Sequence, residues 1–201
     1  MNSAGSSAGS TKGARTRLRI LDAAARVLRE KGYAATRLSD IAEVAGLQTG
    51  SLAFHFPAKG QLLDEVVRHG LAVGLSRVRE AADSLGPDAT PAERVTAAIH
   101  AHLDGLDDRN DFAPAIVRTV DQFPPEARYR LRDVHQDYVA YWHGLLEDAR
   151  LAGAIPADSD TALLTRLILG AMNATLGRND TGPRERLVTT LQSMLGFSGG
   201  T

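Results

Sequence analysis

Residues 32–59, GYAATRLSDIAEVAGLQTGSLAFHFPAK, contain two short helical patterns that meet at a glycine. In the first pattern, LSDIAEVAGL, apolar residues recur close to helical spacing, and Gly46 stands where a helix most readily ends. The second pattern, Thr49 to His55, directs Leu52 and the following Phe56 to one side at i and i+4. The stretch therefore predicts a helix-turn-helix.

The second of these helices has a polar outer face formed by Gln48, Thr49, Ser51 and His55. Small hydrogen-bonding side chains on an exposed short helix suit the edges of bases in a major groove of DNA. An ordinary helical hairpin with a polar face is the alternative explanation for this stretch taken alone.

The preceding segment, TRLRILDAAARVLREKGY, has apolar residues on one helical face and stops at a glycine, which predicts a first helix that packs on the other two. With it, the chain from Thr16 to Leu63 resembles the DNA-binding domain of TetR-type transcriptional repressors. The matching positions are Ile20, Leu21, Ala23, Ala24, Leu28, Gly32, Tyr33, Thr36, Ile41, Ala42, Ala45, Gly46, Gly50, Ser51, Leu52, His55, Phe56, Lys59 and Leu62.

This resemblance implies a set of residues that contact DNA. They are Thr36, Arg37, Ser39, Gln48, Thr49, Ser51, His55 and Lys59. Lys59 is expected to hold a phosphate beside the start of the next helix, with help from the helix dipole. The chain departs from the family at Ala53, where a phosphate-bonding tyrosine is usual, and at Arg37, which replaces Ser or Thr and offers a phosphate or base contact instead.

Charge is distributed unevenly along the chain. Residues 1–60 carry nine basic and four acidic side chains, a net charge of +5, whereas the remainder carries 14 basic and 20 acidic ones, a net charge of −6. A basic module that faces phosphates explains this split. Solvation of helix faces by Lys and Arg is the alternative.

The sequence predicts an all-α protein of about nine helices in two parts. Residues 1–14 are expected to be a disordered tail, 15–60 a helix-turn-helix DNA-binding domain, and 61–201 a helical ligand-binding and dimerisation domain. The helices expected in the second part span 61–84, 91–106, 111–120, 125–151, 158–176 and 183–195, with a capping box at Thr90-Pro91-Ala92-Glu93. No apolar run is long enough to cross a membrane, and we expect a cytoplasmic protein.

Six of the ten aromatic residues lie between 112 and 142. The family resemblance implies an effector pocket in this half, for which the candidates are Phe112, Arg118, Gln122, Phe123, Tyr138, Trp142 and Asn173. Packing in the core is the alternative role for any one aromatic residue.

Catalytic and metal chemistry have no support in the sequence. Cysteine is absent, the histidines at 100, 102, 135 and 143 lack metal-ligand spacing, and no nucleophile or metalloprotease motif occurs. We expect no cofactor, no metal and no enzymatic activity.

The segment LLTRLILGAMNATLG, 163–177, combines small and apolar residues, and with the last helix it resembles the dimer-forming pair of the family. Packing within one chain is the alternative. The same segment is similar to TetR-type regulators of fatty-acid and steroid catabolism, which implies an acyl-CoA or other apolar effector. The resulting hypothesis is a homodimeric repressor of a palindromic operator; a small-molecule binding protein with weakened DNA affinity and an all-helical enzyme are the rivals.

Overall fold

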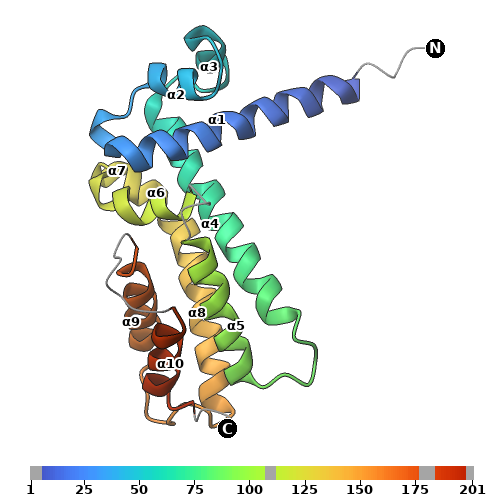
Figure 1. Cartoon of the computed structure of the whole chain (residues 1–201), viewed down its shortest axis with the longest axis vertical. Coiled ribbons are helices and arrows are strands. Elements are labelled where there is room, and N and C mark those ends of the chain that lie inside the picture. The colour runs from blue at the N-terminus through green and yellow to red at the C-terminus, as the bar shows by residue number, and fades with distance from the viewer. Residues whose placement is uncertain (1–5, 107–111, 177–183, 198–201) are drawn as a thin grey trace, which may run out of the picture. The chain divides into compact units, whose positions relative to one another are not determined.

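The computed structural model describes residues 6–106, 112–176 and 184–197, with side chains from Lys12 onward. Within these ranges the chain forms ten α-helices and one short 3-10 helix, η1, and no strand (Figure 1). The predicted all-α class is confirmed. The helices form two compact units, the first comprising Met1–Gly70 with Asp111–Arg132 and the second comprising Leu71–Asn110 with Asp133–Thr201.

The first unit is built on α1, which contacts both α2 and α6. Its elements are α1 (Ser6–Ala35), α2 (Leu38–Val44), α3 (Thr49–His55), the first half of α4 (Lys59–Asp83), α6 (Phe112–Thr119), η1 (Val120–Gln122) and α7 (Pro125–Arg130). Leu28, Ile41, Leu52 and Phe56 are buried in its core. The inward positions predicted for the helix-turn-helix are therefore confirmed.

Residues 6–14, expected to be part of a disordered tail, belong instead to α1. Once a helix has formed, each added residue gains a backbone hydrogen bond without a new nucleation cost, so the basic segment from Lys12 extends the helix that follows it. The Thr16 hydroxyl also donates to the Lys12 carbonyl oxygen at 3.1 Å. The rest of the predicted tail, residues 1–5, lies outside the described residues.

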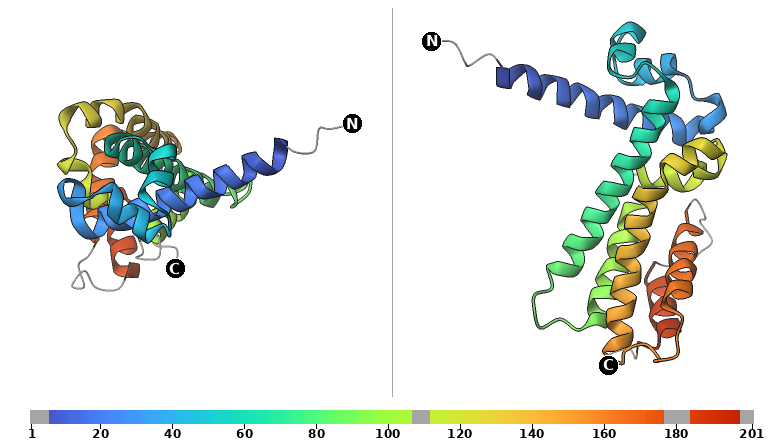
Figure 2. Two further views of the ribbon diagram at one scale, coloured as in Figure 1. Left: turned by 90° about the horizontal axis from the view of Figure 1, so that it is seen from above. Right: turned by 180° about the vertical axis from the view of Figure 1, so that it is seen from behind.

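The second unit contains α5 (Pro91–Gly105), α8 (Arg132–Leu151, from its second residue), α9 (Thr161–Asn173), α10 (Arg184–Leu195) and the second half of α4. Both figures show α5 and α8 running side by side, and α9 next to α10 (Figures 1 and 2). Trp142, Ile99, Leu146 and Ile155 are its largest fully buried side chains.

The start of α5 shows the predicted capping box. The Thr90 hydroxyl accepts from the Glu93 backbone N–H at 3.3 Å, and the Glu93 carboxylate accepts from the Thr90 backbone N–H at 2.8 Å. These two bonds satisfy donors that the helix itself leaves unpaired. The Glu93 carboxylate also accepts from the Thr90 hydroxyl at 2.8 Å, and the bonds from the Thr90 backbone N–H and then from its hydroxyl lower the pKa of the Glu93 carboxyl.

The long helix predicted for residues 125–151 is interrupted at Leu131, which separates α7 from α8. Leu131 is buried, and the Arg68 guanidinium donates to the Arg130 carbonyl oxygen at 2.5 Å. Tertiary contacts therefore stabilise the break, at a place where the sequence has neither Gly nor Pro. No helix in the described ranges is both long enough and apolar enough to cross a membrane.

Candidate nucleic-acid interface and a buried polar cluster

The turn between α2 and α3 fixes the exposed face of the helix-turn-helix. Gly46 has a φ of 63° just after α2, and the Leu47 N–H donates to the Ala42 carbonyl oxygen at 2.8 Å. A left-handed residue followed by such a bond ends a helix and satisfies its last carbonyls. Leu52 then anchors α3 on the core, so that the opposite side of α3 is left to solvent.

Five of the predicted DNA-contacting residues are exposed. Arg37 and Ser39 lie at the start of α2, and Gln48, Thr49 and Ser51 at the start of α3. Neither Arg37 nor Gln48 caps its helix with a side-chain hydrogen bond, although each occupies the N-cap position. Both side chains are therefore exposed and are not used to cap these helices.

The other three predicted residues make contacts inside the unit. Thr36 is 1% exposed, and its hydroxyl donates to the Gly32 carbonyl oxygen at 2.7 Å, so it fixes the link between α1 and α2 and has no free hydroxyl for a base. Lys59 donates to the Tyr33 carbonyl oxygen at 3.1 Å, with its ammonium 4.9 Å from the centre of the Tyr33 ring. His55 is half-buried, and its carbonyl accepts from the Arg17 guanidinium at 3.5 Å.

Two ion pairs link α1 to α4 and to α2. The Arg17 guanidinium donates to the Glu65 carboxylate at 2.7 Å and lies 4.3 Å from the centre of the Phe56 ring. Lys31 on α1 is paired with Asp40 on α2 at 2.8 Å, and this ammonium lowers the pKa of the Asp40 carboxyl. Part of the basic charge of residues 1–60 therefore stabilises the unit itself.

The residues predicted to line one effector pocket are divided between the two units. Gln122 and Phe123 lie against the end of α1: the Gln122 side-chain oxygen accepts from the Tyr33 N–H at 3.0 Å, and the Phe123 ring is 4.5 Å from the Tyr33 ring. Both residues therefore contact the end of α1, where the helix is kinked at Gly32 (φ 75°, ψ 172°). Arg118 is exposed on α6, and the Phe112 ring is 4.9 Å from that of His69.

The remaining three candidates meet in the second unit around a histidine. The Tyr138 hydroxyl lies 2.6 Å from His102 Nδ1, and the Asn173 side-chain oxygen lies 3.1 Å from His102 Nε2. The amide oxygen can only accept, so the neutral imidazole carries its proton on Nε2, and Nδ1 accepts from the tyrosine. The Trp142 ring stands edge-on to the imidazole, with centroids 5.9 Å apart.

This cluster, His102–Tyr138–Trp142–Asn173, is uncharged at neutral pH. Desolvation lowers the pKa of His102 to about 4, although the bond to Asn173 acts in the opposite direction. Burial raises the pKa of Tyr138 to about 12, opposed by the Trp142 side chain and the charge of Arg77. The buried Trp142 indole N–H lies near enough to the Tyr138 oxygen to lower the tyrosine pKa, but it meets no acceptor with full hydrogen-bond geometry.

From the sequence, His102 is considered only as a metal ligand and rejected for its spacing, so its part in this cluster is not predicted. Val95, Ile99, His102 and Leu106 follow one another at helical spacing, and the three aliphatic residues among them are buried. That periodicity places His102 on the inner face of α5 and is the signal that would have identified it. No group of His, Asp or Glu side chains in the described residues is arranged to hold a metal ion.

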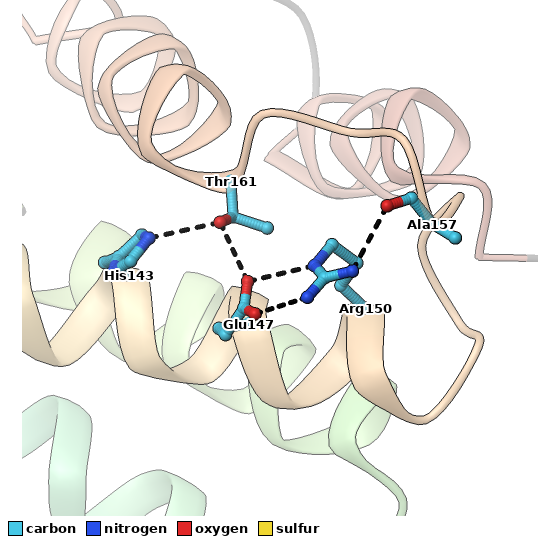
Figure 3. Close-up of polar contacts among 5 residues, drawn as sticks. All are labelled: His143, Glu147, Arg150, Ala157 and Thr161. Carbon is cyan, nitrogen blue, oxygen red and sulfur yellow. Dashed lines mark hydrogen bonds and ion pairs between the residues drawn. The ribbon is translucent and has the colours of Figure 1, made fainter.

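A second polar group joins α8 to the start of α9 (Figure 3). The Thr161 hydroxyl donates to the Glu147 carboxylate at 3.0 Å, and Arg150 donates to the same carboxylate at 3.0 Å and to the Ala157 carbonyl oxygen at 3.1 Å. Because the Thr161 hydroxyl donates its hydrogen bond to Glu147, its oxygen is the acceptor in the contact with His143 Nε2, 3.1 Å away. The bonds from Arg150 and then Thr161 lower the pKa of Glu147 to about 2.

Comparison with known proteins agrees with this arrangement. Residues 20–66 match the family described as bacterial regulatory proteins of the tetR family, and residues 88–176 match the tetracyclin repressor-like C-terminal domain. The HTH-type transcriptional repressor KstR2 of Rhodococcus jostii (strain RHA1) is 33% identical over 155 residues, which cover 76% of this chain and 74% of that protein. The chain belongs to the TetR family of transcriptional regulators.

Solved structures show the same fold for this TetR-family regulator. The FadR regulator of Bacillus subtilis, crystallised with stearoyl-CoA, superimposes with a TM-score of 0.75 at 24% identity, covering 92% of this chain and 99% of FadR. AibR, crystallised with isovaleryl coenzyme A and operator DNA, gives a TM-score of 0.76 at 20% identity, covering 90% and 98%. KstR2 and FadR are transcriptional regulators, which supports a regulatory and not an enzymatic role at the level of the family.

Proposed function

We propose that the protein is a ligand-responsive repressor that binds a palindromic operator as a homodimer. The observation that carries this proposal is the exposed polar face of the helix-turn-helix, where Arg37, Ser39, Gln48, Thr49 and Ser51 are all open to solvent. Arginine and small polar side chains of this kind contact phosphates and base edges. Thr36 and Lys59 have a supporting role, because they hold the end of α1 against the start of α2 and α4.

Dimerisation is supported by an apolar stripe on α9. Leu163, Leu167, Gly170 and Ala174 follow one another at helical spacing and are all exposed, with Leu167 at 50%. An exposed face of this kind is costly in water, and the small residues let a second helix approach closely. A partner copy related by a two-fold axis would cover it and supply the second recognition helix that a palindrome requires.

The proposed effector is an acyl-CoA thioester or a related apolar metabolite. Two structural relatives were crystallised with acyl-CoA molecules, and the second unit of this chain contains a neutral polar cluster whose indole N–H meets no acceptor with full hydrogen-bond geometry. A carbonyl oxygen of an effector would give the buried Trp142 N–H an acceptor with better geometry than the Tyr138 oxygen. The helix α4 runs from the first unit into the second, so the two are linked by a continuous backbone.

Selection from random-sequence duplexes followed by a gel shift tests the proposal. We expect enrichment of a palindrome whose half-sites are centred about one helical turn apart, and loss of the shifted band with isovaleryl-CoA or stearoyl-CoA but not with free coenzyme A. Enrichment of a palindrome that no acyl-CoA releases would contradict the effector class alone. Failure to enrich any palindrome would favour the alternative, a small-molecule binding protein with weakened DNA affinity.

A further inference from the structure

The exposed face of α3 combines one large aromatic side chain with small neighbours. Phe54 is 86% exposed, the highest value among the exposed large hydrophobic residues of the described chain. Gly50 and Ser51 precede it by one helical turn, and Ala53 adjoins it; all three are exposed. A Cβ built on Gly50 would meet no atom within 4 Å. The backbone of α3 is therefore nearly bare around a projecting ring.

The Phe54 ring has few contacts within the protein. Leu52 and Phe56 fill the core beneath α3, each at most 2% exposed. The Phe54 ring meets the edge of the His55 ring, with centroids 5.6 Å apart. Burial of an aromatic ring is a large source of free energy, so a ring left this far in solvent points to a partner outside the chain.

The surroundings of the ring favour a base in the major groove as that partner. The helix-turn-helix belongs to the half of the chain with a net charge of +5, which suits a polyanion. Glycine, serine and alanine on the outer face of α3 allow this helix to approach the floor of a groove closely. A phenyl ring has no hydrogen-bonding group for a phosphate, and the apolar group that bases present in the major groove is the 5-methyl of thymine.

We infer that Phe54 packs against the 5-methyl group of a thymine and thereby specifies that base once in each half-site. The inference rests on the proposed function, because it requires an operator read by α3. In this inference Phe54, the residue after Ala53, identifies a base through an apolar contact. It does not replace the phosphate hydrogen bond that a tyrosine hydroxyl at position 53 would make.

Deoxyuridine, which lacks only that methyl group, provides the test. In the operator obtained by selection, each symmetric pair of thymines is replaced by deoxyuridine, and dissociation constants are measured by fluorescence anisotropy. At one symmetric pair, we expect deoxyuridine to weaken binding of the wild-type protein about four-fold per half-site, or about fifteen-fold over both half-sites. This is the effect expected from losing the burial of one methyl group in each half-site. Phe54→Ala should bind the thymine and deoxyuridine operators equally.

Val44→Ala and Leu18→Ala are matched controls, because these residues are also exposed and apolar, at 46% and 47%, but lie on α2 and α1. Both variants should keep the wild-type ratio between thymine and deoxyuridine operators. A wild-type protein that enriches a palindrome but tolerates deoxyuridine at every position would overturn the inference and leave the proposed function intact. Failure to enrich any palindrome would overturn both.

Sedimentation velocity separates base contact from self-association. If Phe54→Ala changed the association state while the selected sequence and the deoxyuridine ratio stayed the same, the ring would be covered by a second copy of the chain, and the inference would be wrong. We expect wild type and Phe54→Ala to sediment identically.

Discussion

Replacing Gly32 by alanine should destabilise the first unit more than the same change at either of two other glycines. Gly32 has φ 75° and ψ 172°, a region that side chains rarely adopt and that costs about 2 kcal/mol for a non-glycine residue. Its new Cβ would lie 2.8 Å from the side-chain oxygen of Gln122, the atom that accepts from the Tyr33 N–H. Displacing that amide loses a hydrogen bond of about 1 kcal/mol.

Replacing glycine by alanine also reduces the conformational entropy of the unfolded chain, which stabilises the folded protein by about 0.5 kcal/mol. The net cost for Gly32→Ala is therefore about 2.5 kcal/mol. Gly46→Ala should cost about 1 kcal/mol, because φ is 63° but no atom lies within 4 Å of the new Cβ. Gly50→Ala, in ordinary helical and open surroundings, should stabilise the protein by about 0.5 kcal/mol.

Urea denaturation followed by far-ultraviolet circular dichroism measures these differences. At a slope of about 2 kcal/mol per molar urea, Gly32→Ala should lower the midpoint by about 1.2 M. A double-mutant cycle with Gln122→Ala isolates the contact: in that background, Gly32→Ala should cost only the backbone strain, leaving a coupling of about 1 kcal/mol. Equal losses for Gly32→Ala and Gly46→Ala, or zero coupling to Gln122, would refute the reasoning.

Three further predictions concern substitutions in the second unit. Because the folded pKa of Glu147 is lowered to about 2, its contribution to stability is present above its ordinary value of 4.5 and lost as pH falls towards 2; thermal melts of Glu147→Gln should lack that pH dependence. Tyr138→Phe removes the partner of His102 Nδ1 and should lower the free energy of unfolding by about 1–3 kcal/mol, and an unchanged urea midpoint would exclude the bond. Leu167→Glu should convert the proposed dimer to monomer in sedimentation velocity, whereas Leu85→Glu, equally apolar and exposed at 45%, should not.

Local signals in the sequence were enough to predict most of the helix boundaries. Gly46 ends the pattern of α2, and the Thr90 capping box begins α5, because each depends on atoms within a few residues along the chain. The inward residues of α3 were predictable from spacing, since Leu52 and Phe56 leave the other side of a short helix to solvent. Exposure of Gln48 and Ser51 follows from the same geometry.

Contacts between distant segments explain what the sequence did not reveal. The break at Leu131 depends on Arg68, 62 residues from the carbonyl that it contacts, and no local residue announces it. The family resemblance makes Gln122 a candidate for an effector pocket, and the sequence gives no sign that its amide meets Tyr33, 89 residues earlier. Periodicity identifies which side of a helix is buried but not which helix covers it.

The short link between α1 and α2 is where residues predicted for different functions converge. Lys59, expected to contact DNA, binds the Tyr33 carbonyl, and Gln122, expected to contact an effector, binds the Tyr33 N–H. The Thr36 hydroxyl donates to the Gly32 carbonyl oxygen, one residue before Tyr33. Each bond is worth about 1 kcal/mol, which is the size of many coupling free energies between sites. A displacement of η1 that broke the bond between Gln122 and the Tyr33 N–H would therefore lower the stability of the link that positions α2. All the residues in this step belong to the first unit.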